Sequence, residues 1–155
     1  MNKSFLRGVA LPILRWYWKV FKPKTYGVKV IIQHPNSKTI LVVRHSYGDQ
    51  TIWSLPGGGY RPNHESPESA AKHETKEELG IELTNLQKLG EYKTSAQGKR
   101  DRVTIFLSQT LSSTITSNSE IAEFKWMTPT DFVNSSPLYQ ISKHAMHLLK
   151  QKEAN

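Results

Sequence analysis

A triple glycine followed by widely spaced glutamates is the feature that most constrains how this chain can fold. The glycines occupy residues 57–59, and the segment after them carries Glu65, Glu74, Glu77 and Glu78 within fourteen residues. Glycine lets the backbone approach a ligand closely, because it has no Cβ atom. Carboxylates placed this densely repel one another unless a cation or ordered solvent neutralises them. The segment therefore predicts a site for a hard metal ion and a phosphate-bearing ligand.

Composition limits the class of protein without identifying it. The chain has 155 residues, 21 Lys and Arg against 13 Asp and Glu, a formal net charge of +8 and no cysteine. This length suits one domain with its own core. The lack of cysteine excludes disulfides and thiolate metal sites and agrees with a reducing compartment, so we expect a cytoplasmic protein. The positive charge attracts anionic partners of several kinds, but no RNA-binding motif accompanies it, and we expect no nucleic-acid partner.

Residues 1–24 form a basic, aromatic segment at the N-terminus. Leu6, Val9, Ile13 and Tyr17 recur at helical intervals, with basic residues between them. The apolar stretches are far shorter than the roughly 20 residues that a membrane-spanning helix needs. We expect a basic amphipathic helix that packs on the domain or on a second copy of the chain in a homodimer. The alternative is an interfacial helix in peripheral contact with a membrane.

Residues 25–152 alternate between strand-like and helix-like patterns and predict a single α/β domain. Two β-branched runs, at 27–33 and 39–44, flank a turn-forming segment and are typical of a hairpin. Residues 66–79 predict a helix, because a serine N-cap followed by proline opens the segment and Gly80 closes it. Further strands are expected at 51–55, 86–94, 102–110 and 123–127, with a helical turn after Pro129 and a closing helix at 137–152. The alternation favours a mixed sheet with helices on both faces.

The predicted helix concentrates its carboxylates on one side. Successive helical residues are about 100° apart, which places Glu74, Glu77 and Glu78 within an arc of about 100°, beside a less polar stripe with Thr75 and Leu79. Like charges at this spacing destabilise an isolated helix, and carboxylate oxygens suit Mg²⁺ or Mn²⁺. Taken alone, the helix would favour a solvated charged surface. The glycines that precede it shift the balance towards a metal site.

The spacing from Gly59 to Ile81 resembles the Nudix box of the MutT-like hydrolases. Five residues separate Gly59 from Glu65 and seven more separate Glu65 from His73, after which the box continues as His73-Glu74-Thr75-Lys76-Glu77-Glu78-Leu79-Gly80-Ile81. A pattern spread over this many residues is far more specific than a lone glycine motif. The resemblance implies an α/β/α sandwich with a mixed sheet, and the N-terminal helix lies outside the common family core. It also implies hydrolysis of a pyrophosphate bond in a nucleoside diphosphate linked to another moiety, with a nucleotide or nucleotide sugar as substrate.

Carried over residue by residue, the resemblance implies a Mg²⁺ site on the helix, with Mn²⁺ as a substitute. Glu74 and Glu78 would be the principal metal ligands, Glu77 would bind directly or through water, and the carbonyl of Gly58 or of its neighbour Gly59 would complete part of the shell. A general base must lie within hydrogen-bond reach of the attacking water. The candidates are Glu77 and Glu120, a loop residue that is equally well explained as an ordinary surface carboxylate.

Two positions depart from the box. His73 stands where arginine is usual, and histidine lacks the fork that would hold two carboxylates. Thr75 stands where an aliphatic residue packs on the sheet, and its hydroxyl needs a partner. These departures keep a second interpretation open, in which the chain is a catalytically weak nucleotide-binding module of the Nudix fold. A third interpretation is an adaptor whose function resides in the N-terminal helix.

Substrate contacts are only weakly encoded. Arg44 ends the second strand near the expected cleft and Arg102 follows a basic segment, so either side chain could contact phosphates. Trp53 could stack on a base, and Gly59 would let the backbone approach the ligand. Each has an ordinary alternative, since such arginines usually belong to solvated loops and a tryptophan beside a strand is more often part of the core.

Overall fold

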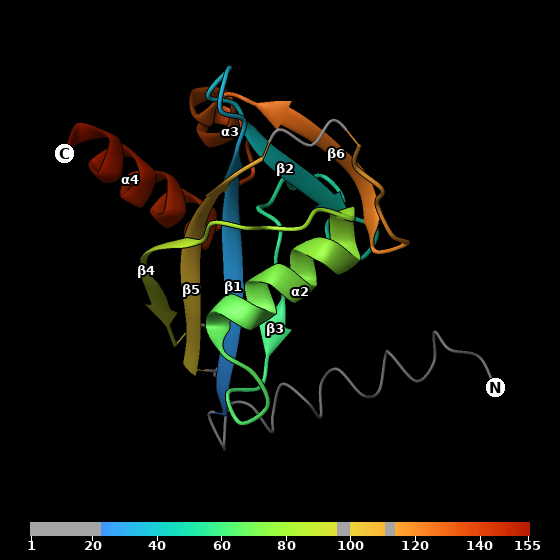
Figure 1. The fold of residues 1–155 in the computed structure, drawn as a ribbon, viewed down its shortest axis with the longest axis vertical. Helices are drawn as coiled ribbons and strands as arrows, with labels where there is room; N and C mark the ends of the chain where they lie inside the picture. The colour runs from blue at the N-terminus through green and yellow to red at the C-terminus, as the bar shows by residue number, and fades with distance from the viewer. Residues whose placement is uncertain (1–22, 96–99, 111–113) are drawn as a thin grey trace.

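The computed structural model describes residues 23–95, 100–110 and 114–155. A six-stranded mixed sheet forms the middle layer and helices lie on both faces (Figure 1), which confirms the predicted α/β architecture. The elements are β1 (Lys24–Gln33), β2 (Ile40–His45), β3 (Gly59–Tyr60), α2 (Pro67–Leu79), β4 (Gln87–Thr94), β5 (Arg100–Gln109), β6 (Ile121–Met127), α3 (Pro129–Asn134) and α4 (Gln140–Ala154). All except β3 were predicted, with ends that differ by a few residues.

The N-terminal helix predicted at residues 1–24 lies outside the described residues apart from its last two, of which Lys24 belongs to β1. Over the described ranges, no helix combines the length and the apolar character needed to cross a membrane.

β1 is the central strand of the sheet, whose order is β4-β5-β1-β2-β6, with β3 also paired to β1. β1 runs parallel to β5, from Lys24 opposite Arg100 to Gln33 opposite Gln109, and the other pairs are antiparallel. A parallel pair needs a long crossover. The chain between β1 and β5 supplies it, because that stretch carries β2, β3, α2 and β4.

β1 and β2 form the predicted hairpin only next to its turn, and then diverge. Beyond the turn, β1 bonds to the glycine segment: the N–H groups of Val28 and Val30 donate to the carbonyls of Gly58 and Pro56 at 2.9 and 3.0 Å. The glycine segment therefore lies within the sheet, between β1 and β2.

The prediction of a short strand at residues 51–55 is wrong. Only Ser54 takes part in the sheet, through a single bridge to Val43 of β2. The residues before it form a turn, because the Asp49 carboxylate accepts hydrogen bonds from the Thr51 N–H at 2.9 Å and from its hydroxyl at 2.6 Å. Strand pairing resumes at β3, opposite the start of β1.

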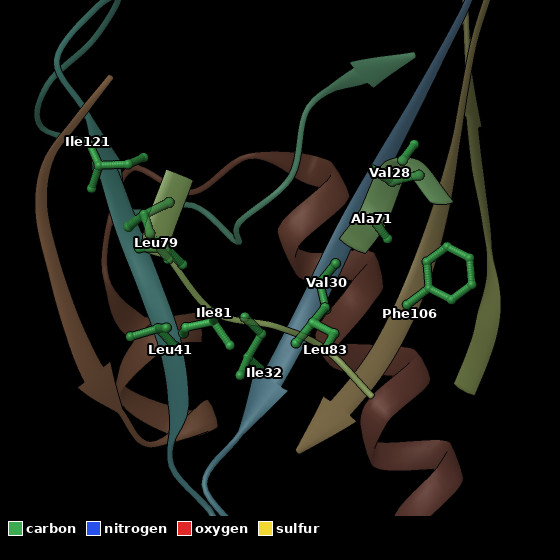
Figure 2. Packing of buried hydrophobic residues seen from close by; sticks show 12 residues of the cluster. Val28, Val30, Ile32, Leu41, Ala71, Leu79, Ile81, Leu83, Phe106 and Ile121 are labelled. Atoms are coloured by element: carbon green, nitrogen blue, oxygen red, sulfur yellow. The ribbon is translucent and has the colours of Figure 1, made fainter. Parts of the chain in front are cut away.

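Two apolar clusters fill the spaces on either side of the sheet. Figure 2 shows the cluster under α2, where side chains from β1, β2 and α2 meet Phe106 of β5. α3 and α4 cover the other cluster. Because strand side chains alternate in direction, Val28, Val30 and Ile32 belong to the first cluster and Ile31 belongs to the second. This arrangement is the α/β/α sandwich that the box implied.

α2 begins and ends where its capping residues predict. Ser66 accepts a hydrogen bond from the Ser69 N–H at 3.1 Å, and Pro67 starts the first turn. At the other end Gly80 has a φ of 67°, and its N–H donates to the Lys76 carbonyl at 2.9 Å. The helix predicted at 66–79 is confirmed.

Thr75 is fully buried on α2, and its hydroxyl has no hydrogen-bond partner. A buried polar group without a partner costs about 1–3 kcal/mol, whereas valine has the same branched shape without the hydroxyl. We therefore expect Thr75→Val to raise the free energy of unfolding by about 1 kcal/mol in urea titrations. Thr84→Val, at an exposed position, is the control and should change stability by less than about 0.5 kcal/mol. A Thr75→Val protein less stable than the wild type would contradict this prediction.

Candidate active site

Glu78 is the most deeply buried carboxylate of α2, with 3% relative exposure. The Gly57 N–H donates to its Oε2 at 2.9 Å, so the side chain connects α2 to the glycine segment. Burial raises the pKa of Glu78, while the Gly57 hydrogen bond and the Lys29 ammonium act in the opposite direction. Backbone geometry thus holds this carboxylate in one place.

Glu74 lies one turn earlier and packs against Gly58. A Cβ atom at Gly58 would overlap the Glu74 carboxylate, so a side chain at this position would push the carboxylate aside. Burial raises the pKa of Glu74, and the charge of Glu77 raises it further. The charge of Glu74 in turn contributes to the raised pKa of Glu78. The buried Glu78 and the half-buried Glu74 therefore repel each other in the metal-free protein.

Glu77 and His73 lie on the exposed side of α2. His73 Nε2 is 3.6 Å from Glu77 Oε1, and both side chains are more than half exposed. When protonated, His73 makes one contact to a carboxylate where the box arginine would offer a two-pronged one. Glu77 acts on Glu74 through its charge while its own side chain stays in solvent.

Glu120 belongs to the loop before β6 and approaches the helix carboxylates from the end of β2. Ser46 fixes this loop, because its N–H donates to the Glu120 carbonyl and its hydroxyl to the Ser119 carbonyl, each at 2.8 Å. The charge of Glu120 contributes to the raised pKa of both Glu74 and Glu78. The structure thus brings this loop residue within electrostatic reach of the helix pair.

Lys29 is a site residue that the sequence reasoning missed. It lies in β1 between two fully buried valines, and its Nζ donates to the carbonyls of Leu55 and Gly57 at 2.8 Å each. Burial lowers the pKa of Lys29, and the charges of Glu78 and Glu74 oppose that shift. The sequence contained a signal for it, since a single charge interrupts a β-branched run that has to be buried.

Two predicted substrate contacts, Arg44 and Trp53, contact each other. Trp53 is only 6% exposed, and the cations of Arg44 and Lys125 lie over its ring at 4.3 and 4.2 Å from the centroid. Arg44 also pairs with Glu123 at 3.4 Å. Because the ring is already covered, a base would have to displace a cation in order to stack on it.

The other two predicted contacts, Arg102 and Gly59, lie near the start of β1. Arg102 Nε is 3.7 Å from the Glu91 carboxylate, and its side chain lines a pocket of about 420 Å³. Gly59 and Gly58 line a separate pocket of about 330 Å³. Ile141 of α4 also lines this second pocket, and no glutamate of α2 is among its lining residues.

The residues at the carboxylate pair fit a hard divalent cation. Oxygen ligands suit Mg²⁺ and Mn²⁺, and a cation between Glu74 and Glu78 would offset the burial and repulsion that raise the pKa of both. The Gly58 carbonyl keeps a free lone pair after accepting from Val28. Within the ranges that the structure describes, no three His, Cys, Asp or Glu side chains converge as a metal cluster. The remaining coordination positions would therefore fall to water and substrate phosphate.

The raised pKa of Glu74 predicts a pH-dependent stability of the metal-free protein. A carboxyl group with a higher pKa in the folded state stabilises the fold when protonated, and this contribution is complete below the unfolded pKa of about 4.3 and is lost as the pH rises through the folded pKa. With EDTA present, we expect Glu74→Gln to be more stable than the wild type at about pH 7 and equally stable near about pH 4. Urea unfolding across this range measures the difference. A difference that does not change with pH would contradict the prediction.

A glycine segment set against one buried and one half-buried carboxylate, inside an α/β/α sandwich, is the arrangement of a class of hydrolase that acts on phosphoanhydride bonds. A family model agrees: the NUDIX domain model matches residues 23–149. The chain therefore belongs to the Nudix family, as a hydrolase of the pyrophosphohydrolase type. A comparison with curated protein sequences gave no match.

Several solved structures share the fold over most of the chain. The MutT protein from Methanosarcina mazei Go1 has a TM-score of 0.74 and 20% identity, over 86% of this chain and 98% of that one. The NUDIX domain of Shewanella oneidensis NrtR, complexed with ADP ribose, has a TM-score of 0.70 and 14% identity, over 98% and 99%. A C. elegans Ap4A hydrolase binary complex has a TM-score of 0.67 and 22% identity, over 84% and 97%. At sequence identities this low, the similarity shows only that the fold is shared.

Proposed function

We propose that this protein hydrolyses a pyrophosphate bond in a nucleoside diphosphate linked to another moiety, with Mg²⁺ as cofactor and Mn²⁺ as a substitute. One observation carries the proposal: two carboxylates of α2 are held against the glycine segment, the buried Glu78 by the Gly57 N–H at 2.9 Å and the half-buried Glu74 by packing on Gly58. We assign this activity to a domain that spans residues 25–152.

In this proposal, the glutamates of α2 hold the cation. Glu74 and Glu78 are its principal ligands, Glu77 binds it directly or through water, and the Gly58 carbonyl supplies a further oxygen. A bound divalent cation would neutralise the pyrophosphate oxygens and lower the pKa of the attacking water. The glycine segment fixes Glu74 and Glu78 before the ligand arrives, which lowers the cost of organising the site.

Glu120 and Glu77 are the proposed general bases. Glu120 is the stronger candidate, because Ser46 fixes its loop and its charge acts on both Glu74 and Glu78. As base, it would take a proton from the water that attacks phosphorus. The bridging P–O bond then breaks, the water oxygen stays on the attacked phosphorus, and both products end in phosphate groups.

The proposed substrate class is a nucleotide joined to a second group through phosphates. Among the similar structures, one is described as an Ap4A hydrolase and another was solved with ADP ribose, and both compounds are adenosine derivatives with phosphoanhydride bonds. The pocket of about 330 Å³ at Gly58 and Gly59 has the size of a small-ligand site. We propose it for the group attached to the phosphates. Arg44 and Arg102 are proposed phosphate contacts, with Trp53 acting through the Arg44 cation that it supports.

A substrate panel tests the proposed function. The full chain is incubated with nucleoside triphosphates, dinucleoside polyphosphates, ADP-ribose and nucleotide sugars, in Mg²⁺, Mn²⁺ or EDTA, and products are separated by anion-exchange chromatography. We expect metal-dependent cleavage of at least one class, with solvent oxygen in one product when the water carries ¹⁸O. If no class is cleaved with either metal, the proposed function is wrong.

A catalytically weak nucleotide-binding module is the second candidate. His73 favours it, because this residue makes a single contact to Glu77 where the box arginine would hold the glutamates more firmly. Isothermal titration calorimetry with the same panel separates the two candidates. A binding module would bind a nucleotide tightly and leave it intact, whereas the enzyme would convert it.

Localisation and assembly stay predictions. We expect a cytoplasmic protein whose residues 1–24 either pack in a homodimer or contact a membrane surface. Deleting this segment and comparing both forms by vesicle sedimentation and by molecular mass in solution distinguishes these outcomes. Loss of vesicle binding would favour the membrane role, and loss of a dimer would favour packing between subunits.

A further inference from the structure

Four successive carbonyl groups at residues 55–58 all accept hydrogen bonds from β1. Two of these bonds come from the backbone of β1, where the N–H groups of Val30 and Val28 donate to Pro56 and Gly58 at 3.0 and 2.9 Å. The backbone of β1 thus reaches only every second carbonyl of this segment, as it would in a strand pair.

The other two carbonyls, of Leu55 and Gly57, accept hydrogen bonds from a side chain of β1. The Lys29 ammonium group donates to Leu55 and Gly57 at 2.8 Å each. Both of these residues are buried, and a buried carbonyl without a partner costs free energy. The Leu55 carbonyl also accepts from the Ser54 hydroxyl, at a longer 3.2 Å. Lys29 therefore completes the pairing of this segment with β1 where no backbone donor is available.

The bonds from Lys29 bracket the peptide unit that holds Glu78. That unit joins Pro56 to Gly57, and its N–H donates to the Glu78 carboxylate at 2.9 Å. Lys29 fixes the peptide unit immediately before it, through the Leu55 carbonyl, and the one immediately after it, through the Gly57 carbonyl. Because peptide units are planar, fixing both neighbours leaves the middle unit little freedom to rotate.

We propose that Lys29 is a positioning residue: it fixes the backbone of residues 55–58 and thereby the carboxylates Glu74 and Glu78 that bind the metal. This inference deepens the proposed function and rests on it for the identity of the ligand. The competing role is a simple counter-charge to the two carboxylates. The geometry favours positioning, because among the described residues Lys29 makes no ion pair with a carboxylate, while both of its bonds to carbonyls are short.

The two roles predict opposite effects on metal binding. If Lys29 were only a counter-charge, its removal would leave the carboxylates more negative and Mn²⁺ would bind more tightly. If Lys29 positions the glycine segment, its removal lets the carboxylates shift and Mn²⁺ binds more weakly.

Lys29→Met tests the proposal, because methionine keeps the length of the side chain and removes all three donors. We expect Mn²⁺ affinity, measured by calorimetry, to fall by about 10–100-fold. In the metal-free protein, hydrogen exchange at the Gly57 amide should accelerate by about tenfold or more. For a substrate found in the panel, kcat should fall by about 10–100-fold with KM nearly unchanged. Lys88→Met, at an exposed position of β4, is the matched control and should change none of these quantities.

Mn²⁺ binding that is unchanged or tighter in Lys29→Met would overturn the proposal. If this variant does not fold, Lys29→Gln gives the same test, since its amide is neutral but retains N–H donors; tighter Mn²⁺ binding there would also overturn it. The Gly57 exchange rate needs neither metal nor substrate. This rate therefore tests the positioning role of Lys29 even if the wild type cleaves no substrate and the proposed function is wrong.

Discussion

Glu78→Gln is expected to abolish Mg²⁺-dependent hydrolysis while the protein stays folded. Glutamine keeps an oxygen that can accept the Gly57 hydrogen bond, so the link between α2 and the glycine segment survives. It removes the negative charge that the cation requires, at the most buried ligand of the proposed set. We expect kcat to fall by about 10²–10³-fold or more, and Mn²⁺ binding by calorimetry to weaken in parallel.

The matched control for this variant is Glu82→Gln. Glu82 is exposed, just beyond the end of α2, and pairs with Lys76 at 2.7 Å. The same chemical change at this position should leave turnover and Mn²⁺ affinity unaltered, because a surface ion pair contributes little. Near-normal turnover in Glu78→Gln would contradict the assignment of the metal site.

Gly57→Ala should have the largest effect on folding among the substitutions considered. Gly57 has a φ of +122°, a region that residues with a Cβ atom rarely adopt, and a Cβ atom there would overlap the Val28 carbonyl of β1. Relief requires the glycine segment to move away from β1, which breaks the bonds from Lys29 and to Glu78. We expect a loss of about 3 kcal/mol in the free energy of unfolding, measured by urea titration, and loss of hydrolysis.

Gly48→Ala separates the two causes of that effect. Gly48 also has a positive φ, +73°, but an added Cβ atom would meet nothing within 4 Å. The backbone strain alone should therefore cost about 1 kcal/mol, with hydrolysis retained. If the two variants were equally stable, the close approach of Gly57 to β1 would have no energetic consequence and our description of the segment would be wrong.

Local sequence signals were sufficient for the helix that carries the carboxylates. Ser66 and Gly80 act on the backbone within one turn of their own positions, so their effect does not depend on the rest of the fold. The burial of Thr75 and the exposure of Glu77 follow from the same helical period. For this reason the ends of α2 and the arrangement of its carboxylates could be predicted before the structure was known.

Contacts that join different strands of the sheet could not be predicted from local sequence signals. The strand expected at 51–55 failed because Asp49 forms a local turn and because the pairing partner of the next residues is β1. The parallel pair of β1 and β5 joins segments that are far apart in the sequence. The contacts of Trp53 could not be predicted for the same reason. The Arg44 and Lys125 cations lie over its ring because of the register in which β2 pairs with β6.

The glycine-and-glutamate spacing by itself determined the family, the carboxylate helix and the reaction class. These properties depend on residues close together in the chain, where a helix fixes relative positions within a few turns. Only the tertiary structure decided what holds those carboxylates: the glycine segment lies between diverging strands, Lys29 reaches it from β1, and Glu120 approaches from a distant loop. The physical reason is that sheet pairing and burial join groups of large sequence separation, whose contacts leave no local periodic pattern.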